Sequence, residues 1–363
     1  MDDEQPAKRS RRRHRPVDVA IVYNVDFEDQ RGAADPNFEA RATVESVAQE
    51  VAAALNSDGA HDARLVPMGG DFAELRAQLD ASPPMCVFNM CETLGGDARL
   101  ETAVPTVLDL LGIPYTGSDA NALSASLYKD RVKQRLARAG VPTPKGLLVK
   151  EPTDRCNLRF PLIVKPAQED GSAGIWNRSV VHDRDSLQAR VDEIISSFKA
   201  PCLVEQYIDG REFNVAILGY PQPRVLPLQE ISFAKLPPGQ HKIVSYDAKW
   251  RTGSVEDLGT QPVLHPDLPS SVAARLQRAA TDAFRALGLR DYGRVDLRLS
   301  ASGVPYVIDV NPNCDLSPDA GFARAANAVG INYAALARLL VSYALSRKKR
   351  NANARGARTA SSR

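Results

Sequence analysis

The feature that most constrains this chain is a pair of alternating segments rich in Val, Leu and Ile near its carboxyl end, residues 295–299 and 306–310. A short polar turn separates them, and this pattern predicts a β-hairpin. Because side chains alternate along a strand, Asp296, Asp309 and Asn311 can share one face. Three oxygen donors that converge suit a hard cation such as Mg²⁺. A solvated edge hairpin is the alternative, and the rest of the chain must decide between them.

The composition excludes several classes of protein. The 363 residues are 44% hydrophobic and 25% charged, which is typical of a water-soluble chain with two or three domains. No apolar run approaches the length of a membrane span, and the amino terminus lacks the apolar stretch of a secretory signal. The five scattered cysteines indicate buried thiols in a reducing compartment, not a disulfide framework or a zinc site. We therefore expect a cytoplasmic protein.

Basic charge is concentrated at the two ends of the chain. Residues 1–16 hold six Lys/Arg against three Asp/Glu, and residues 346–363 hold seven against none. The net charge of the whole chain is only +2, so the body between the tails is acidic. We expect both tails to be disordered. Contact between the tails and nucleic acid is an alternative that we do not favour.

Strands and helices alternate between residues 17 and 120, which predicts a small doubly wound parallel sheet. Ligands bind such sheets at the carboxyl ends of the strands, so the loops after Tyr23 and Asn89 should lie near a site. The expected elements are a strand over 17–23, a helix over 41–56, a strand at 65–67, a helix capped by Asp71, a strand over 85–89 and a helix that Gly112 ends.

The middle of the chain carries features expected of a phosphate site. A helix over residues 121–139 is interrupted near Lys129, and a strand over 160–166 contains Lys165 close to its end. A loop of small residues follows at 169–174, and its backbone N–H groups can fold over phosphates. The loop has neither the spacing of a P-loop nor that of a Rossmann turn, so both of those sites are excluded.

The next part of the chain is expected to be antiparallel. Residues 202–208 and 212–218 are strand-like on either side of Asp209-Gly210, which predicts a second hairpin. The stretch over 234–262 is long, polar and weakly patterned. A segment of that length inside a compact chain is more typical of a functional element than of a structureless loop.

These pieces, in this order, resemble the ATP-grasp superfamily and, within it, the D-alanine–D-alanine ligase family. The resemblance covers residues 17 to about 345 and leaves out only the two tails. Each motif is weak alone, but the ordered set is specific. The motifs are Gly112-Ile113-Pro114-Tyr115-Thr116-Gly117-Ser118, Leu127-Tyr128-Lys129, residues 160–166 with 171–174, residues 203–212, Tyr246-Asp247-Ala248-Lys249, Gly293-Arg294-Val295-Asp296 and Asp309-Val310-Asn311.

The resemblance implies a mixed α/β and α+β chain, with an ATP-grasp fold behind an N-terminal doubly wound parallel domain. The implied domains are 17–120 on the substrate side, 121–204 with the glycine-rich loop and 205–345 with the metal site. The implied activity is that of an ATP-dependent ligase, which joins an amino acid or peptide-like carboxylate to an amine through an acyl phosphate. D-alanine–D-alanine ligase proper is one alternative, and a non-catalytic ATP-binding module is another. A homodimer is also compatible with the resemblance.

The resemblance also implies a role for each matching residue, although isolated lysines and arginines are more often solvated or paired at a surface. Arg294 would steady the acyl phosphate and the tetrahedral intermediate, and Lys249 and Ser172 would assist near the γ-phosphate. The nucleotide would be bound by Lys129, Lys165, Gly171, Ser172, Gly174, Glu205, Ile208 and Glu212, with the last three along adenine and ribose. Asp296, Asp309 and Asn311 would hold Mg²⁺, or Mn²⁺ in its place.

Departures from the family pattern gather where the substrates would bind. Asp309 replaces a Glu, which keeps two oxygens for a metal. Gly171 and Trp250 stand at two positions that help close the ligases over their first D-alanine, and Asn313-Cys314-Asp315 replaces a Pro-Gly segment. The counterpart of a Glu near the first strand is open between Glu28, Glu39 and Glu45, and residues 91–96 replace a His-Gly loop. We therefore expect the ATP chemistry to be retained and the substrates to differ.

Overall fold

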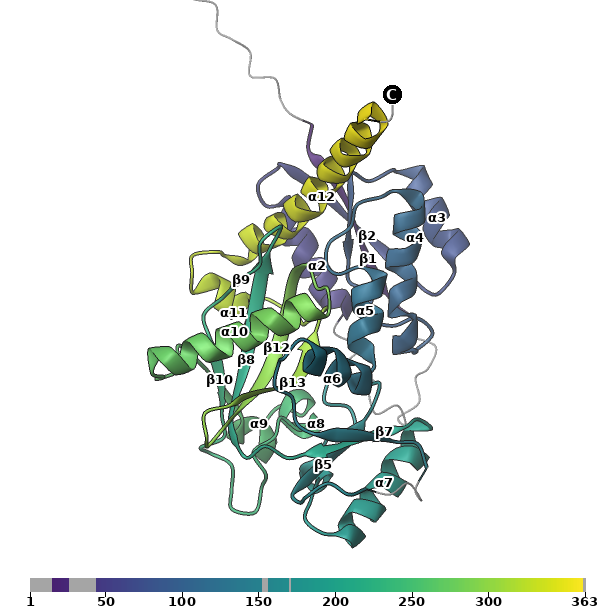
Figure 1. The fold of residues 1–363 in the computed structure, drawn as a ribbon. Helices are drawn as coiled ribbons and strands as arrows, with labels where there is room; N and C mark the ends of the chain where they lie inside the picture. The colour runs from purple at the N-terminus through teal and green to yellow at the C-terminus, as the bar shows by residue number, and fades with distance from the viewer. Residues whose placement is uncertain (1–14, 26–43, 152–155, 170, 362–363) are drawn as a thin grey trace, which may run out of the picture.

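The computed structural model describes residues 15–25, 44–151, 156–169 and 171–361. Within these residues the strands form three sheets, of three, four and six strands. In Figure 1 the three-stranded sheet lies at the top beside the end of α12 (Tyr333–Ser361), and the four-stranded sheet lies at the bottom. The basic tail predicted at residues 1–16 falls almost wholly outside the described residues, which begin at Arg15.

The N-terminal sheet is parallel, with the strand order β2-β1-β3. Alternate residues of the buried central strand pack on opposite sides: Ile21 contacts the α2 layer, and Val22 contacts α3 and α4. Both faces are therefore covered by helices, which confirms the predicted doubly wound domain. The elements are β1 (Val17–Asn24), α2 (Val44–Asn56), β2 (His61–Met68), α3 (Phe72–Ala81), β3 (Cys86–Asn89), a 3₁₀ turn (Ala98–Thr102) and α4 (Ala103–Leu111).

The four-stranded sheet has the order β4-β7-β5-β6, and its paired strands are antiparallel. Helix α7 packs on it through Leu187, Val191 and Ile194. Tyr128 has an extended backbone, so the preceding helix breaks there, as predicted, and α6 starts at Lys129. The elements are α5 (Ala120–Leu127), α6 (Lys129–Arg138), β4 (Gly146–Val149), β5 (Leu162–Pro166), a 3₁₀ turn (Asn177–Ser179), β6 (Val180–Val181), α7 (Arg184–Phe198) and β7 (Cys202–Gln206).

The six-stranded sheet has the order β11-β10-β8-β12-β13, with β9 paired to β8. The predicted hairpin at residues 295–310 is confirmed as β12 and β13. Helix α10 buries Leu276 and Phe284 against Val215 and Val295, so one face of the sheet is apolar and the other is left for polar side chains. The elements are β8 (Gly210–Gly219), β9 (Arg224–Val225), β10 (Gln229–Ser232), α8 (Tyr246–Trp250), α9 (Val255–Gly259), β11 (Gln261–Leu264), α10 (Ser270–Ala286), β12 (Asp291–Ser300), β13 (Pro305–Asn311), α11 (Gly321–Asn327) and α12 (Tyr333–Ser361).

The predicted hairpin around Asp209-Gly210 is wrong. Strand β7 pairs with β4 and β5, whereas β8 pairs with β9, β10 and β12, so the two strands belong to different sheets. A Cβ at Gly210 would lie 2.0 Å from the backbone oxygen of Leu299, so this glycine lets β12 approach closely and does not make a hairpin turn. The domain boundary predicted between residues 204 and 205 falls inside β7.

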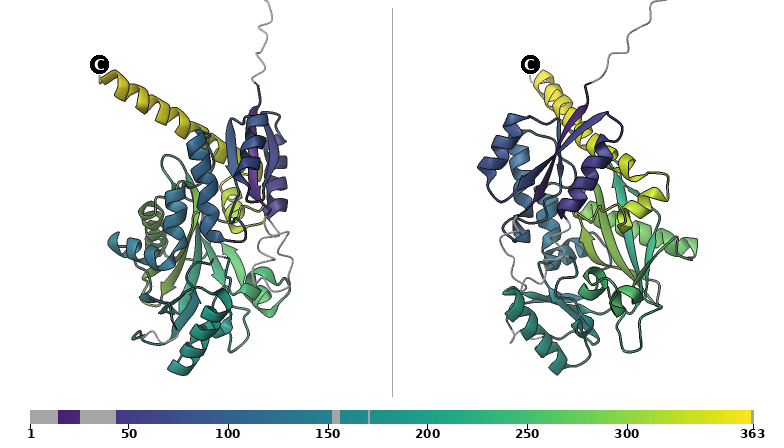
Figure 2. Two further views of the ribbon diagram at one scale, coloured as in Figure 1. Left: turned by 90° about the vertical axis from the view of Figure 1, so that its right-hand side faces the viewer. Right: turned by 180° about the vertical axis from the view of Figure 1, so that it is seen from behind.

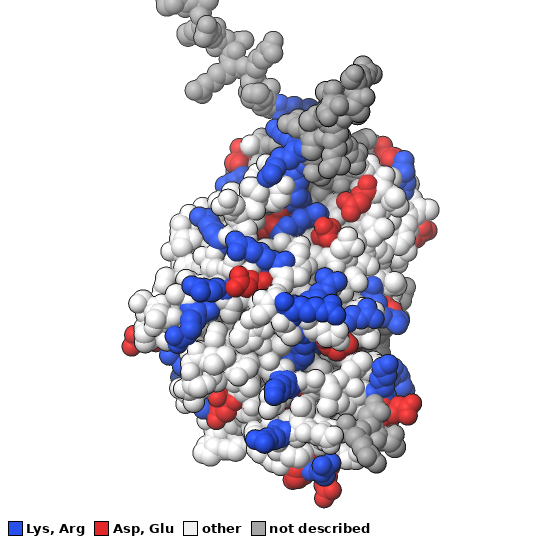
Figure 3. Space-filling model, viewed as in Figure 1, with Lys and Arg blue, Asp and Glu red and all other residues white. Residues whose placement is uncertain are grey.

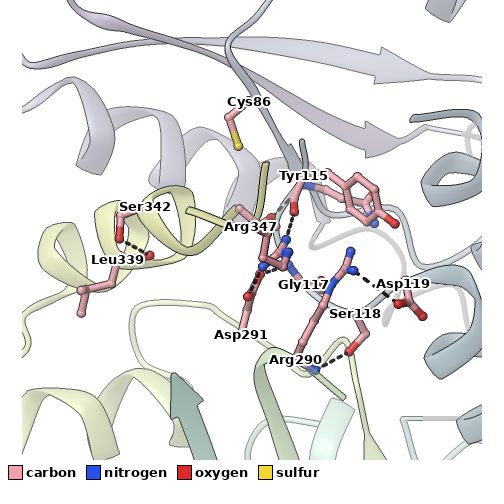
Figure 4. A network of polar contacts seen from close by, with 12 residues as sticks. Cys86, Tyr115, Gly117, Ser118, Asp119, Arg290, Asp291, Leu339, Ser342 and Arg347 are labelled. Atoms are coloured by element: carbon pink, nitrogen blue, oxygen red, sulfur yellow. Dashed lines mark hydrogen bonds and ion pairs between the residues drawn. The ribbon is translucent and has the colours of Figure 1, made fainter. Parts of the chain in front are cut away.

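Residues 346–361 are helical, which differs from the disordered tail expected over 346–363. Helix α12 runs without a break to Ser361 and extends beyond the body (Figures 1 and 2). Arg347 is buried and forms an ion pair with Asp291, which is fully buried at the start of β12. The same arginine donates to the backbone oxygen of Tyr115, so the network in Figure 4 ties α12 to the loop at 112–118. Composition alone cannot reveal a partner so distant in the sequence.

Among the described residues, no helix has both the length and the apolar character needed to cross a membrane. On the face shown in Figure 3, basic side chains gather over the region of α12, α10 and α6, with acidic side chains scattered between them.

Candidate active site

A cleft of about 970 Å³ lies where the three sheets meet. Its lining includes Met90 beside the N-terminal sheet, Lys165 on β5 and Asp296 on β12, so each sheet contributes to it. Of the predicted site residues, all but Gly174 line this cleft: Lys129, Lys165, Gly171, Ser172, Glu205, Ile208, Glu212, Lys249, Arg294, Asp296, Asp309 and Asn311.

The hairpin of β12 and β13 brings the predicted metal ligands together. Asp296 stands directly opposite Asp309, and Arg294 stands opposite Asn311. Arg294 donates from Nε and Nη2 to the two carboxylate oxygens of Asp296, at 2.8 and 2.9 Å. Asn214 on β8 donates to the same carboxylate at 2.8 Å, and Asn311 does so at 3.2 Å. Asp296 is therefore held by side chains from three strands.

Asp309 lies close to two lysines, Lys129 at the start of α6 and Lys165 on β5. Burial alone would raise the pKa of its carboxyl, but Lys129 and Lys165 outweigh burial and lower that pKa. The Nζ atom of Lys129 is 3.3 Å from Oδ1 of Asp309, and Lys165 donates to the backbone oxygen of Ile308 at 3.2 Å. Asp309 is therefore ionised at neutral pH, as a metal ligand must be.

A buried charge cluster surrounds Glu205 on β7. Its carboxylate oxygens lie 2.5 Å from Nζ of Lys133 and 2.8 Å from Nζ of Lys165. Burial would raise the pKa of Glu205, but the two lysines lower it. Burial also lowers the pKa of Lys133. Lys133 was not predicted from the sequence, although it follows Lys129 by one helical turn on α6 and so faces the same way.

A second buried pair joins Glu212 to Arg298, with 2.8 Å between the charged atoms. The two residues are opposite each other on β8 and β12. Burial raises the pKa of Glu212 even though Arg298 opposes that rise. The guanidinium of Arg298 also lies over the rings of Tyr207 and Phe233. Arg298 was not predicted from the sequence, although its even spacing from Arg294 and Asp296 places it on the same face of the strand.

The glycine-rich loop is fastened to the segment that carries Lys249. The hydroxyl of Ser172 donates to the backbone oxygen of Val244 at 2.9 Å, and the indole of Trp250 donates to that of Gly171 at 2.8 Å. Gly174 was predicted to bind the nucleotide, but it is not among the residues that line the cleft. A Cβ there would lie 2.8 Å from Phe198, so packing accounts for this glycine. The stretch over 234–262 thus serves as one wall of the cleft.

Lys249 sits at the junction between the glycine-rich loop and the β12–β13 hairpin. The surrounding protein removes water from its ammonium, and Arg294 repels it, so the pKa of Lys249 is lowered. Asp315 and Glu92, which line the far end of the cleft, oppose that shift. Charged groups at both ends of the cleft therefore affect the pKa of Lys249.

The far end of the cleft is bounded by the segment after Asn311. Asn313 accepts a hydrogen bond from the hydroxyl of Tyr292 at 2.7 Å and donates to Glu101 at 3.2 Å. Asp315 accepts from the backbone N–H of Ser317 at 2.8 Å, which shapes the turn that follows. Of the three glutamates considered near the first strand, Glu28 and Glu39 lie outside the described residues. Glu45 accepts a hydrogen bond from Gln49 on α2 and is not among the residues that line the cleft.

The fold defines the class of protein first. A D-alanine–D-alanine ligase from Bacillus anthracis, solved in complex with ATP, superposes with a TM-score of 0.71 at 22% identity, over 93% of this chain and 99% of that one. Two antiparallel sheets meet at a cleft that holds lysines, an arginine and carboxylates, beside a parallel N-terminal sheet. This chain has the ATP-grasp fold.

Sequence comparisons identify the family. The family model described as D-ala D-ala ligase C-terminus matches residues 149–342. A D-alanine–D-alanine ligase of Desulforudis audaxviator is 32% identical over 70% of this chain and 80% of its own length. Protein y4sG of Sinorhizobium fredii, described as uncharacterized, is 37% identical over 69% of this chain and 71% of its own. The chain belongs to the D-alanine–D-alanine ligase family and is an ATP-dependent carboxylate–amine ligase.

Proposed function

We propose that this chain uses ATP to join the carboxylate of an amino acid or peptide-like substrate to an amine. A carboxylate oxygen bonds to the γ-phosphorus as the bond to the bridging oxygen breaks, which releases ADP. The amine nitrogen then bonds to the acyl carbon, inorganic phosphate leaves, and the nitrogen loses a proton. The observation that carries the proposal is the hairpin pair Asp296 and Asp309, set in one cleft with Arg294 and three lysines.

The nucleotide is proposed to lie between the four-stranded and six-stranded sheets. Lys129 and Lys165 would contact its α- and β-phosphates, because both ammonium groups reach the cleft beside Asp309. Glu205 and Ile208 would border the adenine, and Glu212 would bind the ribose hydroxyls. The backbone of Gly171 and Ser172 would cover the phosphates, since hydrogen bonds to Val244 and Trp250 hold that loop against the cleft. The other nearby cation, Lys133, would keep Glu205 ionised.

The donor set at the hairpin fits Mg²⁺. Asp296 and Asp309 offer two opposed carboxylates and Asn311 an amide oxygen, so the available donors are the oxygens that hard cations prefer. The same set would accept Mn²⁺. We propose that these three side chains hold the metal. A bound metal would neutralise charge on the β- and γ-phosphates.

Arg294 and Lys249 are proposed to act on the reacting groups. Asp296 holds the guanidinium of Arg294 in a two-point contact, which fixes its plane on the cleft side of β12. A guanidinium fixed in this way can stabilise the charge that builds up on the acyl phosphate and on the tetrahedral intermediate. Lys249, next to the glycine-rich loop, would contact the γ-phosphate. The Ser172 hydroxyl already donates to Val244, so we assign Ser172 to positioning the loop.

The substrates are where we expect this chain to differ from its relatives. The ligases to which it is similar are named for D-alanine, which makes D-alanine the first substrate to test. At the far end of the cleft, Asn313-Cys314-Asp315 does not follow the family pattern, and Asp315 adds a negative charge there. We therefore propose that an amino acid or peptide-like substrate other than D-alanine is used best.

ADP release with ATP, Mg²⁺ and a panel of D- and L-amino acids tests the proposal. We expect particular substrates to raise ADP release well above the rate with ATP alone. If no amino acid or pair of amino acids does so, the proposal fails. If D-alanine alone gives the highest kcat/KM, the activity stands and the substrate proposal is overturned.

Three further features stay predictions that experiments can test. All five cysteines are buried and unbridged, which favours a reducing compartment such as the cytoplasm. A homodimer would be detected by light scattering. Contact between the basic tails and nucleic acid would be detected as salt-dependent binding to a DNA or RNA probe.

A further inference from the structure

A row of four polar side chains crosses the six-stranded sheet on the cleft side. Gln229 on β10 is opposite Asn214 on β8, Asn214 is opposite Asp296 on β12, and Asp296 is opposite Asp309 on β13. Directly paired residues on neighbouring strands point to the same face of a sheet. All four residues line the cleft. Gln229 is the end of the row that lies farthest from the lysines of the nucleotide site.

Gln229 differs from the other three members of the row in one respect. Asn214, Asp296 and Asp309 are joined by hydrogen bonds or ion pairs to neighbouring side chains. Gln229 is 97% buried, at 3% exposure, yet in the described part of the chain its side-chain amide has no hydrogen-bond partner. Its remaining exposure is to the cleft, so a ligand there can supply the missing partner.

The sequence keeps space for this amide. A Cβ at Gly321 would lie 2.3 Å from the side-chain oxygen of Gln229 and 3.4 Å from its Cδ. Any larger residue at position 321 would therefore push the amide away from its present place. Gly321 also lines the cleft, at the start of α11.

We infer that Gln229 is a specificity-determining residue, which hydrogen-bonds a polar side chain on one of the two amino-acid substrates. The inference rests on the proposed function and adds the chemical class of the substrate. Two strand spacings of about 4.8 Å separate Gln229 from Asp296, so their backbones lie about 10 Å apart. A substrate held beside Asp296 can therefore reach Gln229 with a short polar side chain such as that of asparagine.

The surrounding charges limit which polar side chains fit. Asp315 and Asp319 line the same end of the cleft. One cation, Arg324, also lines the cleft and donates to the backbone oxygen of Asp319, so the two acids outnumber it. A carboxylate-bearing substrate side chain would meet these acids, whereas an amide or hydroxyl would not be repelled. The pocket thus favours a neutral or donor-rich side chain over an acidic one.

The test uses the full-length protein and the isosteric pair asparagine and leucine, each as D and L forms. ADP release gives kcat/KM for each amino acid, offered alone and together with each other member of the substrate panel. We expect the wild type to prefer asparagine to leucine by at least about 10-fold, because leucine leaves the amide unpaired. In Gln229→Leu that preference should fall or reverse by about 10-fold or more, while the KM for ATP stays the same.

Two further variants keep the test decisive. Gly321→Ala should also lower the preference for asparagine over leucine. This variant replaces Gln229→Leu in the test if Gln229→Leu does not fold. Gln240→Leu removes an amide that contacts Glu256 outside the cleft lining, and its preference should match the wild type. An unchanged asparagine-to-leucine ratio in folded Gln229→Leu and Gly321→Ala, with ADP release intact, overturns this inference alone. The absence of ADP release with every amino acid overturns the proposed function and the inference with it.

Discussion

The two ends of the cleft are built differently. At the nucleotide end, charged side chains are fixed by opposite charges on strands and on α6, as in the buried cluster of Lys133, Glu205 and Lys165. At the substrate end, much of the lining comes from the segment after Asn311, which includes Asn313 and Asp315, together with Gln229 on β10. Positions on paired strands are rigid, whereas loops tolerate change. The comparison teaches that one scaffold can keep its ATP chemistry while its substrate pocket changes.

The largest effect is expected for Asp296→Asn, at the boundary between the two ends. The substitution keeps the shape of the side chain but removes the charge that holds Arg294 and would hold the metal. We expect kcat to fall on the order of 10³-fold, or ~4 kcal/mol. ADP release at saturating ATP measures the effect.

A matched control is Asp80→Asn, which removes a carboxylate that pairs with Arg76 on the exposed side of α3. It should leave kcat unchanged, because that ion pair lies far from the cleft lining. Wild-type turnover in a folded Asp296→Asn protein would contradict the assignment of the hairpin.

A truncation tests how much the contact between α12 and β12 stabilises the fold. Deleting residues 346–363 removes Arg347 and leaves the buried carboxylate of Asp291 without its ion-pair partner (Figure 4). We expect the free energy of unfolding to fall by about 3 kcal/mol, measured by urea denaturation. Deleting only 351–363 keeps Arg347 and should cost much less. Equal stability of the two truncated proteins would rule out this role for α12.

The nucleotide end can be tested alone with Glu205→Gln. The change leaves Lys133 and Lys165 without their shared counter-charge, so the free energy of unfolding at pH 7 should fall by about 2 kcal/mol. ATP binding, measured by calorimetry, should weaken too. If ATP affinity and stability both stay at wild-type values, the buried cluster has no such role.

The stability difference between the wild type and Glu205→Gln should also depend on pH. The pKa of Glu205 is lowered in the folded protein, so its contribution is complete above the unfolded value of about 4.3 and is lost as pH falls through the folded pKa. The difference in stability between the wild type and Glu205→Gln should therefore shrink below about pH 4.3. A difference that grows on acidification would contradict this sign.

The smallest effect is expected for Lys249→Arg, which lies where the two ends meet. The lowered pKa of Lys249 means that it loses its charge at a lower pH than an ordinary lysine. Arginine stays charged, so the alkaline limb of the kcat profile should move to higher pH, with kcat at pH 7 reduced at most several-fold. An alkaline limb that stays in place would show that another group titrates there.

The sequence predicted those parts of the site that depend on local order along the chain. Alternation along a strand was enough to place Asp296 and Asp309 on one face, and the ordered motifs brought Lys129 and Lys165 to the same cleft. The three-stranded parallel domain was predicted for the same reason, since its strands and helices follow one another in sequence.

The parts that were missed depend on contacts distant in sequence. Strand β7 was joined to β8 because both segments look like neighbours in a hairpin, yet each pairs within its own sheet. Lys133 was missed because its partner, Glu205, lies 72 positions further on, and burial of both could not be foreseen. The same is true of Arg347 with Asp291, and of Gln229, whose importance comes from a missing partner.

The most direct test of the central claim follows oxygen from substrate to phosphate. An amino acid labelled with ¹⁸O in its carboxylate is incubated with ATP, Mg²⁺ and the amine substrate, and the inorganic phosphate is examined by mass spectrometry. An acyl phosphate requires that one labelled oxygen leaves with each phosphate released, in step with amide formation and ADP release. Amide formation with unlabelled phosphate would contradict the account.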